Sequence, residues 1–145
     1  MPLDELTHTV IGIAMTVHRE MGPGFLESIY HRCMEIELAR AGLPFDSAAP
    51  INVFYKGKIA GNFIADLIIS SETPLLIELK AVEAIKKEHE AQVVNYLSAT
   101  GIDEALILNF GALSLQFKHK FRNRNTRIAP ADTRAEFARP SDNPS

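Results

Sequence analysis

The chain has 145 residues, with 46% hydrophobic and 23% charged side chains, which is typical of one globular domain. It contains no apolar run near the roughly 18 residues of a membrane span and no secretory signal, so we expect a cytoplasmic protein without membrane contact. The single cysteine, Cys33, excludes a disulfide framework, and the net charge of -3 argues against nucleic-acid binding through bulk positive charge.

Two helices are predicted at the start of the chain, ahead of the strands. Apolar residues that recur at four, three and four positions predict one buried stripe on the first helix (Leu6, Val10, Ile13 and Val17). This helix should end at the sequence MGPG over residues 21–24, because the residue before a proline disfavours helical geometry. A second helix is expected from about Leu26 to Ala41. Its predicted apolar face holds Leu26, Ile29, Cys33 and Ile36.

Three strands should follow, because the hydrophobic period changes to two after Pro44. They are predicted over residues 51–55, 59–69 and 75–81, with short polar links that favour an antiparallel meander. Alternation along the third strand places Glu78 and Lys80 on the same face.

A third helix is expected over residues 83–100, with Gln92 and Tyr96 one turn apart on one side. Two short apolar strands are predicted at 105–110 and 113–117. We therefore expect an α/β fold with one domain over residues 1–128. The proline-rich polar stretch 129–145 is predicted to be a disordered tail.

Three charged residues, Asp66, Glu78 and Lys80, interrupt the most hydrophobic strands. A buried charge must be paired, must bind a metal or must lie at an exposed strand end. Two carboxylates beside an ammonium suit a hard divalent cation, and the lysine could then help to orient or deprotonate an attacking water. A salt bridge that holds the hairpin together is an equally good interpretation of the same spacing.

The order of these residues along the chain resembles a known family. Residues 24–30 read GFLESIY, which matches the signature of the GxxExxY protein family, a branch of the PD-(D/E)XK nuclease superfamily. Asp66 and the Glu78-x-Lys80 pair follow in the expected order, and the similarity extends to the LNFG sequence at 108–111. Ala65 stands where the superfamily pattern has proline, and the four cysteines of some RecB-like nucleases are absent.

The resemblance implies a restriction-endonuclease-like αβββαβ core, with a mixed central sheet flanked by helices and an extra N-terminal helix. It implies that Mg²⁺ or Mn²⁺ is bound by Asp66, Glu78, the backbone carbonyl of Leu79 and Glu27, the last directly or through water. Lys80 then resembles the active-site lysine.

Further roles are implied for residues outside the carboxylate cluster. Gln92 and Tyr96 resemble the QxxxY motif of RecB-like and lambda-exonuclease-like nucleases, which helps to position the active site or the nucleic acid. Tyr30, the last residue of the family signature, is expected to help in positioning the substrate as well. His18 is either an additional metal ligand, as in some relatives, or a histidine with a structural hydrogen bond.

The charge is unevenly distributed. Residues 1–117 hold 8 basic and 15 acidic side chains, whereas 118–127 hold five basic residues and no acid. This run is either a solvated strand end or a phosphate contact, and the candidate contacts are Lys118, Lys120, Arg122 and Arg124.

We therefore expect a divalent-metal-dependent nuclease that hydrolyses phosphodiester bonds in DNA or RNA, with DNA favoured. The alternative is a non-catalytic module that retains the fold and binds nucleic acid or protein. Because the chain has little room for a separate recognition domain, a partner protein or a second copy of the chain could deliver it to its substrate.

Overall fold

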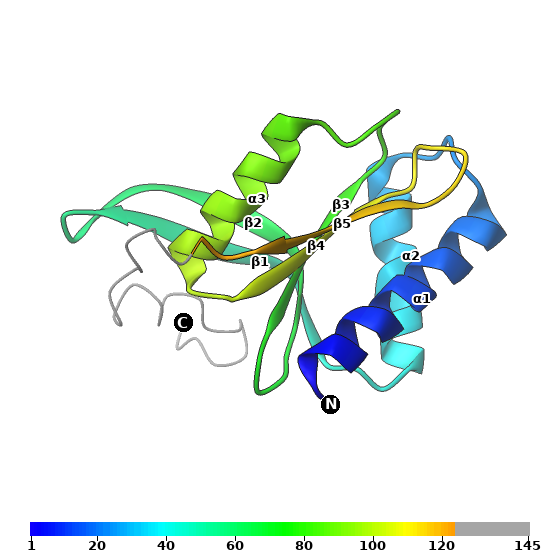
Figure 1. The fold of residues 1–145 in the computed structure, drawn as a ribbon, viewed down its shortest axis with the longest axis horizontal. Coiled ribbons are helices and arrows are strands. Elements are labelled where there is room, and N and C mark those ends of the chain that lie inside the picture. The colour runs from blue at the N-terminus through cyan, green and yellow to red at the C-terminus, as the bar shows by residue number, and fades with distance from the viewer. Residues whose placement is uncertain (124–145) are drawn as a thin grey trace.

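The computed structural model describes residues 1–123, which form three helices and five strands (Figure 1). In chain order these are α1 (Leu3–Met21), α2 (Glu27–Arg40), β1 (Phe45–Tyr55), β2 (Lys58–Ile69), β3 (Leu75–Lys80), α3 (Lys87–Thr100), β4 (Glu104–Asn109) and β5 (Gln116–Phe121). The predicted tail over 129–145, the end of the predicted 1–128 domain and Arg124 lie outside the described residues.

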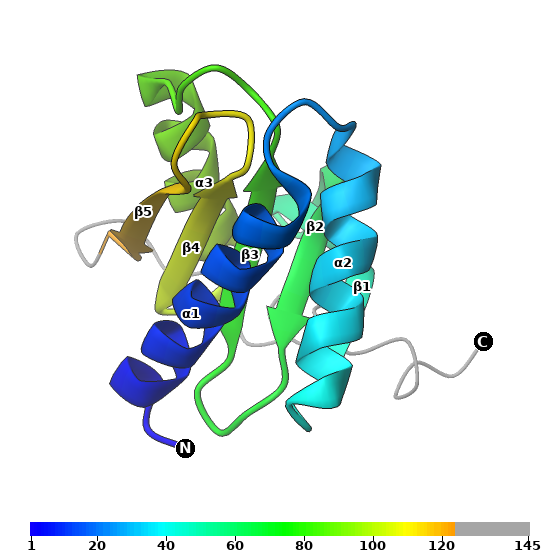
Figure 2. The same ribbon diagram turned by 90° about the vertical axis from the view of Figure 1, so that its right-hand side faces the viewer.

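The strands form one mixed sheet in the order β1-β2-β3-β4-β5. Neighbouring strands are antiparallel except β3 and β4, which are parallel and are connected through α3. Helices α1 and α2 cover one face of the sheet, and α3 covers the other (Figure 2). The predicted meander, the mixed sheet and the extra N-terminal helix are thus confirmed. No helix in the described part of the chain combines the length and the apolar character needed to cross a membrane.

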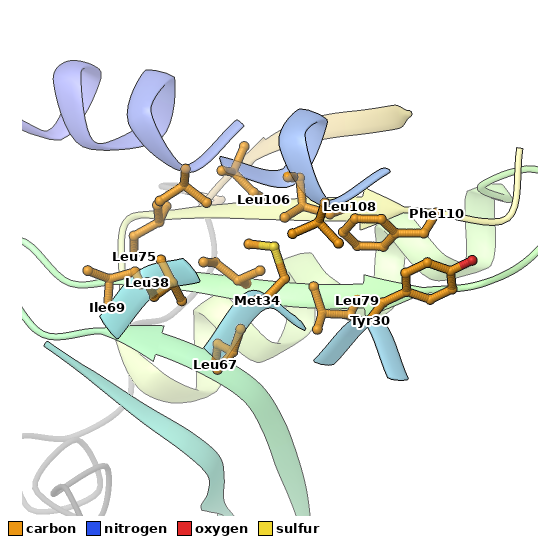
Figure 3. Packing of buried hydrophobic residues seen from close by; sticks show 14 of the residues in the cluster. Tyr30, Met34, Leu38, Leu67, Ile69, Leu75, Leu79, Leu106, Leu108 and Phe110 are labelled. Atoms are coloured by element: carbon orange, nitrogen blue, oxygen red, sulfur yellow. The ribbon is translucent and has the colours of Figure 1, made fainter. Parts of the chain in front are cut away.

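Alternate strand residues supply two hydrophobic cores. In β3, Leu75, Ile77 and Leu79 pack beneath α1 and α2 (Figure 3), whereas Leu76 belongs to the smaller core beneath α3. Because side chains alternate along a strand, Glu78 is on the same side of β3 as Leu76. The α3 face of the sheet therefore carries the charged residues of this strand.

The predicted apolar face of α2 is wrong. Leu26 is 75% exposed, and Ile29 and Ile36 are also exposed, while Cys33 is half-buried. The buried side chains of α2 are Tyr30, Met34 and Leu38, which recur every four residues. Burial of the large tyrosine ring favours this face, since its hydroxyl reaches the Gly22 carbonyl at 2.5 Å and is not left unsatisfied.

Three elements also have boundaries that differ by three or more residues from the prediction. Strand β1 begins at Phe45 instead of residue 51 and continues through Pro50. A proline is tolerated there because β1 is an edge strand, with one side free of ladder hydrogen bonds. Helix α3 begins at Lys87, four residues late, and β5 spans Gln116–Phe121 instead of 113–117. Lys118 and Lys120 consequently lie on a strand.

The loop between β3 and α3 is held by a buried asparagine. The Asn109 Oδ1 atom accepts hydrogen bonds from the backbone N–H groups of Val82 at 2.9 Å and Gly111 at 3.1 Å. Gly111 lies so close to this loop that a Cβ atom there would be 2.3 Å from the Val82 carbonyl oxygen. The two chain segments that follow β3 and β4 are thus joined without room for a side chain.

A Gly111→Ala substitution should lower the free energy of unfolding by about 1–3 kcal/mol, because the backbone must shift to relieve this overlap. Urea denaturation measures the change. Gly12→Ala on α1 is the matched control, since a Cβ there meets nothing within 4 Å and should stabilise the helix by about 0.5–1 kcal/mol. Equal stability of Gly111→Ala and the wild type would contradict the steric argument.

Candidate active site

Two carboxylates stand where strands β2 and β3 part. The ladder between these strands contains the pairs Leu67–Ile77, Leu76–Ile68 and Leu75–Ile69, and Asp66 and Glu78 come next along each strand. At this point hydrogen bonds from backbone N–H groups to side-chain carboxylates replace the backbone–backbone pairing of the two strands. The Asp66 Oδ2 atom accepts the Leu79 N–H at 2.7 Å, and the Glu78 Oε1 atom accepts the Asp66 N–H at 3.3 Å. Both carboxylates are therefore fixed by backbone groups of the opposite strand.

This position makes ionisation of Glu78 unfavourable. Its side chain is buried, and burial, together with the nearby charge of Asp66, raises its pKa to about 8. The hydrogen bond from the Asp66 N–H and the charge of Lys80 oppose this shift. Burial also raises the pKa of Asp66, against the hydrogen bond from Leu79 and the charges of His31 and Lys80. Burial thus disfavours ionisation of both carboxylates at the same time, because little water is present to stabilise two negative charges.

Lys80 ends β3 on the same side as Glu78 and is half-buried. Its ammonium lowers the pKa of Asp66, Glu78 and Glu27, so it lies within electrostatic reach of all three. Among residues 1–123 its Nζ atom takes part in no ion pair. Within these residues the alternative interpretation, a lysine that bridges the hairpin, therefore has no ion pair to support it. Asp66 and Glu78 each accept a backbone N–H.

Glu27 approaches the same cluster from another element. It is the first residue of α2, where the positive end of the helix dipole favours a carboxylate. Burial raises its pKa, and the charge of Asp66 raises it further, while Lys80 and His31 act in the opposite direction. The structure therefore brings Glu27, Asp66, Glu78 and Lys80 into one electrostatic cluster, although no three His, Cys, Asp or Glu side chains among the described residues are grouped closely enough to hold a metal ion.

The sequence matches a family model over most of its length. Residues 4–122 match the model of the PD-(D/E)XK nuclease superfamily. The chain belongs to this superfamily. Its mixed sheet with flanking helices is thus the predicted restriction-endonuclease-like fold.

Comparison with solved structures supports the fold alone. The crystal structure of SSO0001 is similar with a TM-score of 0.51 and 17% identity, over 68% of this chain and 50% of that chain. The chain thus spans half of the length of SSO0001. No curated protein matches the sequence.

In this PD-(D/E)XK protein, α3 places the aromatic ring of Tyr96 beside the cluster. The Tyr96 ring stacks on Phe63 of β2, with centroids 3.6 Å apart and planes at 6°. Burial raises the pKa of Tyr96, and the charges of Glu78 and Asp66 raise it further, so the phenol lies near both carboxylates. Gln92 lies one turn earlier on α3 and is exposed. Of the two residues of the QxxxY motif, Tyr96 is thus the one that adjoins the cluster.

Tyr30 and His18 pack around Phe110, away from the carboxylate pair. Tyr30 is fully buried and stacks on Phe110 at 4.8 Å, and its hydroxyl donates to Gly22 and accepts the Phe25 N–H. These hydrogen bonds hold the turn that precedes Glu27. The His18 Nε2 atom is 2.9 Å from the Ala112 carbonyl oxygen, and the ring stacks on Phe110. These contacts favour the structural interpretation of His18.

Sequence reasoning missed His31. Its charge lowers the pKa of both Glu27 and Asp66, and its Nε2 atom is 2.8 Å from the Ser47 hydroxyl of β1. Ser47 in turn donates a hydrogen bond to Glu35, so the imidazole is oriented by a serine that is itself held in place. The spacing in the sequence could have indicated this role. Residues four apart on a helix share a face, and His31 follows Glu27 by four positions, so the two side chains are expected on the same side of α2.

The basic run is largely neutralised within the described residues. Lys120 pairs with Glu90 of α3 at 3.0 Å, and Arg122 pairs with Asp103 at 2.9 Å. Lys118 is exposed on β5, and its charge lowers the pKa of Glu90. Of the predicted phosphate contacts, Lys118 is thus the most accessible in this part of the chain.

Proposed function

We propose that this protein is a divalent-metal-dependent nuclease that hydrolyses phosphodiester bonds in nucleic acid, with DNA as the favoured substrate. The observation that carries the proposal is the pair of carboxylates held at the parting of β2 and β3, with the Lys80 ammonium beside them. Within the superfamily we assign it to the GxxExxY family and the RecB-like branch, on the motif at 24–30 and on Gln92 and Tyr96.

The donor set fits a hard cation. Mg²⁺ and Mn²⁺ prefer oxygen ligands, and Mg²⁺ is usually bound through one or two protein carboxylates while it keeps several waters. Asp66 and Glu78 would supply the carboxylates, the Leu79 carbonyl a third oxygen, and Glu27 would act directly or through water. A bound cation would also offset the negative charge that raises the pKa of Glu78. When bound, it would lower the pKa of the attacking water and neutralise charge on the scissile phosphate.

Each remaining residue has a defined task in this proposal. Lys80 orients the attacking water and stabilises the negative charge that develops on the phosphate oxygens. Asp66 and Glu78 hold their positions through the backbone of the opposite strand, so little rearrangement is needed when substrate binds. The Tyr96 hydroxyl, near both carboxylates, can donate a hydrogen bond to a phosphate oxygen or to a water in the site.

Cleavage of labelled single- and double-stranded DNA and RNA with Mg²⁺ or Mn²⁺ tests the proposal. We expect cleavage that EDTA abolishes. Asp66→Asn should reduce the cleavage rate by about 100-fold or more, because a neutral amide of nearly the same shape replaces a negatively charged metal ligand. Glu72→Gln, in the exposed turn between β2 and β3, is the control and should retain wild-type activity. Absence of cleavage of all four substrates with either metal would contradict the enzymatic proposal.

A non-catalytic module that retains the fold and binds nucleic acid or protein is the second candidate. It is favoured by one observation, since no three His, Cys, Asp or Glu side chains in residues 1–123 are grouped closely enough to hold a metal ion. Thermal melting separates the two functions. A competent site should be stabilised by Mn²⁺ or Mg²⁺ in a way that Glu78→Gln removes, because a ligand that binds only the folded state raises its stability. A non-catalytic module should melt at the same temperature with and without metal.

The cytoplasmic location remains a prediction, and so does the delivery of this protein to its substrate by a partner protein or a second copy of the chain.

A further inference from the structure

The β1–β2 hairpin extends well beyond the rest of the sheet. Pairing between β1 and β2 continues out to Tyr55 and Lys58, whereas β2 pairs with β3 only over residues 67–69. We call residues 49–65 the arm. Figure 1 shows it reaching away from α1 and α2 and past α3. Within residues 1–123, its distal part is a two-stranded ribbon with no third strand beside it.

The arm starts directly at the candidate active site. Ala65 of β2 is buried beneath α3, Phe63 stacks on Tyr96, and the next residue toward the sheet is Asp66. Lys58 lies eight residues from Asp66 on the same strand, so the tip is about 26 Å from the carboxylate at the strand rise of roughly 3.3 Å per residue. The packing at its base fixes the direction in which the arm leaves the site.

The surface of the tip is positive and partly aromatic. No Asp or Glu occurs between Asp46 and Asp66, whereas Lys56 and Lys58 are both exposed. Tyr55 is 66% exposed and Ile59 is 60% exposed, and the Lys56 ammonium is 5.3 Å from the centre of the Tyr55 ring. Neither core contains these side chains. The tip thus carries two positive charges and an exposed ring that packing of the fold does not explain.

We propose that the arm is a DNA-binding ribbon that enters the major groove of a duplex about eight base pairs from the scissile phosphate. This inference rests on the proposed nuclease function and specifies its substrate. A two-stranded ribbon fits the major groove of B-form DNA, whereas the major groove of duplex RNA is too deep and narrow for side chains to enter. At about 3.4 Å per base pair, eight pairs span the 26 Å from Asp66 to the tip. Lys56 and Lys58 then contact phosphates on either side of the groove.

Binding of a 30-base-pair DNA duplex, measured by fluorescence anisotropy in EDTA so that no cleavage occurs, tests the arm. Lys56→Ala/Lys58→Ala should weaken affinity about tenfold at 50 mM salt and reduce the slope of log affinity against log salt by about 1.8, because two phosphate contacts are lost. The control is Arg32→Ala/Arg40→Ala, which removes two exposed positive charges from α2 and should leave affinity within about twofold.

Two further measurements separate this inference from the proposed function. Hydrolysis of bis(p-nitrophenyl) phosphate with Mn²⁺ should be the same for the arm variant and the wild type, since this small diester cannot reach the tip. If the wild type cleaves none of the four nucleic-acid substrates but the arm variant still loses duplex affinity, the nuclease proposal is contradicted and the DNA-binding ribbon is supported. Unchanged duplex affinity in the arm variant overturns the ribbon. An equal loss for a 30-nucleotide single strand also overturns it, because a ribbon in a groove requires a duplex.

Discussion

Replacing Lys80 with methionine should reduce nucleic-acid cleavage by about 100- to 1,000-fold while changing stability by less than about 1 kcal/mol. A group that stabilises developing charge in a partly buried site contributes this much to the rate. The Nζ atom has no ion pair within residues 1–123, so its removal breaks no contact that holds the fold. Single-turnover cleavage and urea denaturation of the same preparation measure the two effects.

Arg40→Met is the matched control for Lys80→Met. Arg40 ends α2, at the opposite end of the helix from Glu27, and its exposed guanidinium pairs with Glu37. Exposed pairs of this kind contribute about 0–1 kcal/mol, so this variant should retain both activity and stability. If Lys80→Met cleaves as fast as Arg40→Met, the lysine has no part in the chemistry.

The metal-free protein should lose stability as the pH rises from about 5 to 8. In this window the unfolded chain has an ionised Glu78, whereas the folded protein keeps it protonated, since its pKa is raised from 4.5 to about 8. Folding therefore takes up a proton, and the free energy of unfolding falls as pH rises, by up to about 5 kcal/mol for a shift of this size. The raised pKa values of Asp66 and Glu27 act in the same direction.

Thermal or urea denaturation between pH 5 and 9 measures this effect, and Glu78→Gln isolates it. The glutamine variant cannot ionise, so its stability should depend less on pH, and it should exceed the wild type in stability above pH 8. Mn²⁺ should stabilise the wild type more at high pH than at low pH, because the cation binds the ionised carboxylate. Parallel pH profiles for the wild type and Glu78→Gln would show that Glu78 titrates normally.

The order of elements could be predicted from the sequence because each element carries a simple period. The first helix has its stripe at Leu6, Val10, Ile13 and Val17. Ile13 is half-buried and the other three are buried. The chain also holds Asp66 and Glu78 in its most apolar strands, where a charge has few structural explanations. Periodicity and this anomaly together indicate that the two carboxylates lie on neighbouring strands, whereas the resemblance to the nuclease superfamily is what favours a metal site over a salt bridge.

Details that depend on partners far along the chain could not be predicted in this way. Helix α2 has two apolar stripes, and only the fit of Tyr30 beneath Gly22 and Phe110 decides which one is buried. The position of His31 depends likewise on Ser47, which lies in β1 but four residues ahead of the predicted start of that strand. The extent of the arm could not be foreseen either, because no local period reveals where β2 loses its neighbour β3.

In the proposed nuclease Asp66 would both bind the metal and stabilise the strand pair, and this changes how descendants of this chain should be compared. Its carboxylate satisfies the Leu79 N–H, and an unsatisfied buried donor costs about 1–3 kcal/mol, so a copy that had lost catalysis would still gain stability from an acid at this position. Lys80 brings no such structural benefit through hydrogen bonds among the described residues, and Glu27 gains only about 0.3–1 kcal/mol from the positive end of the α2 dipole. In a lineage drifting away from nuclease activity, these two positions should vary first, and their identity is the better marker of a working enzyme.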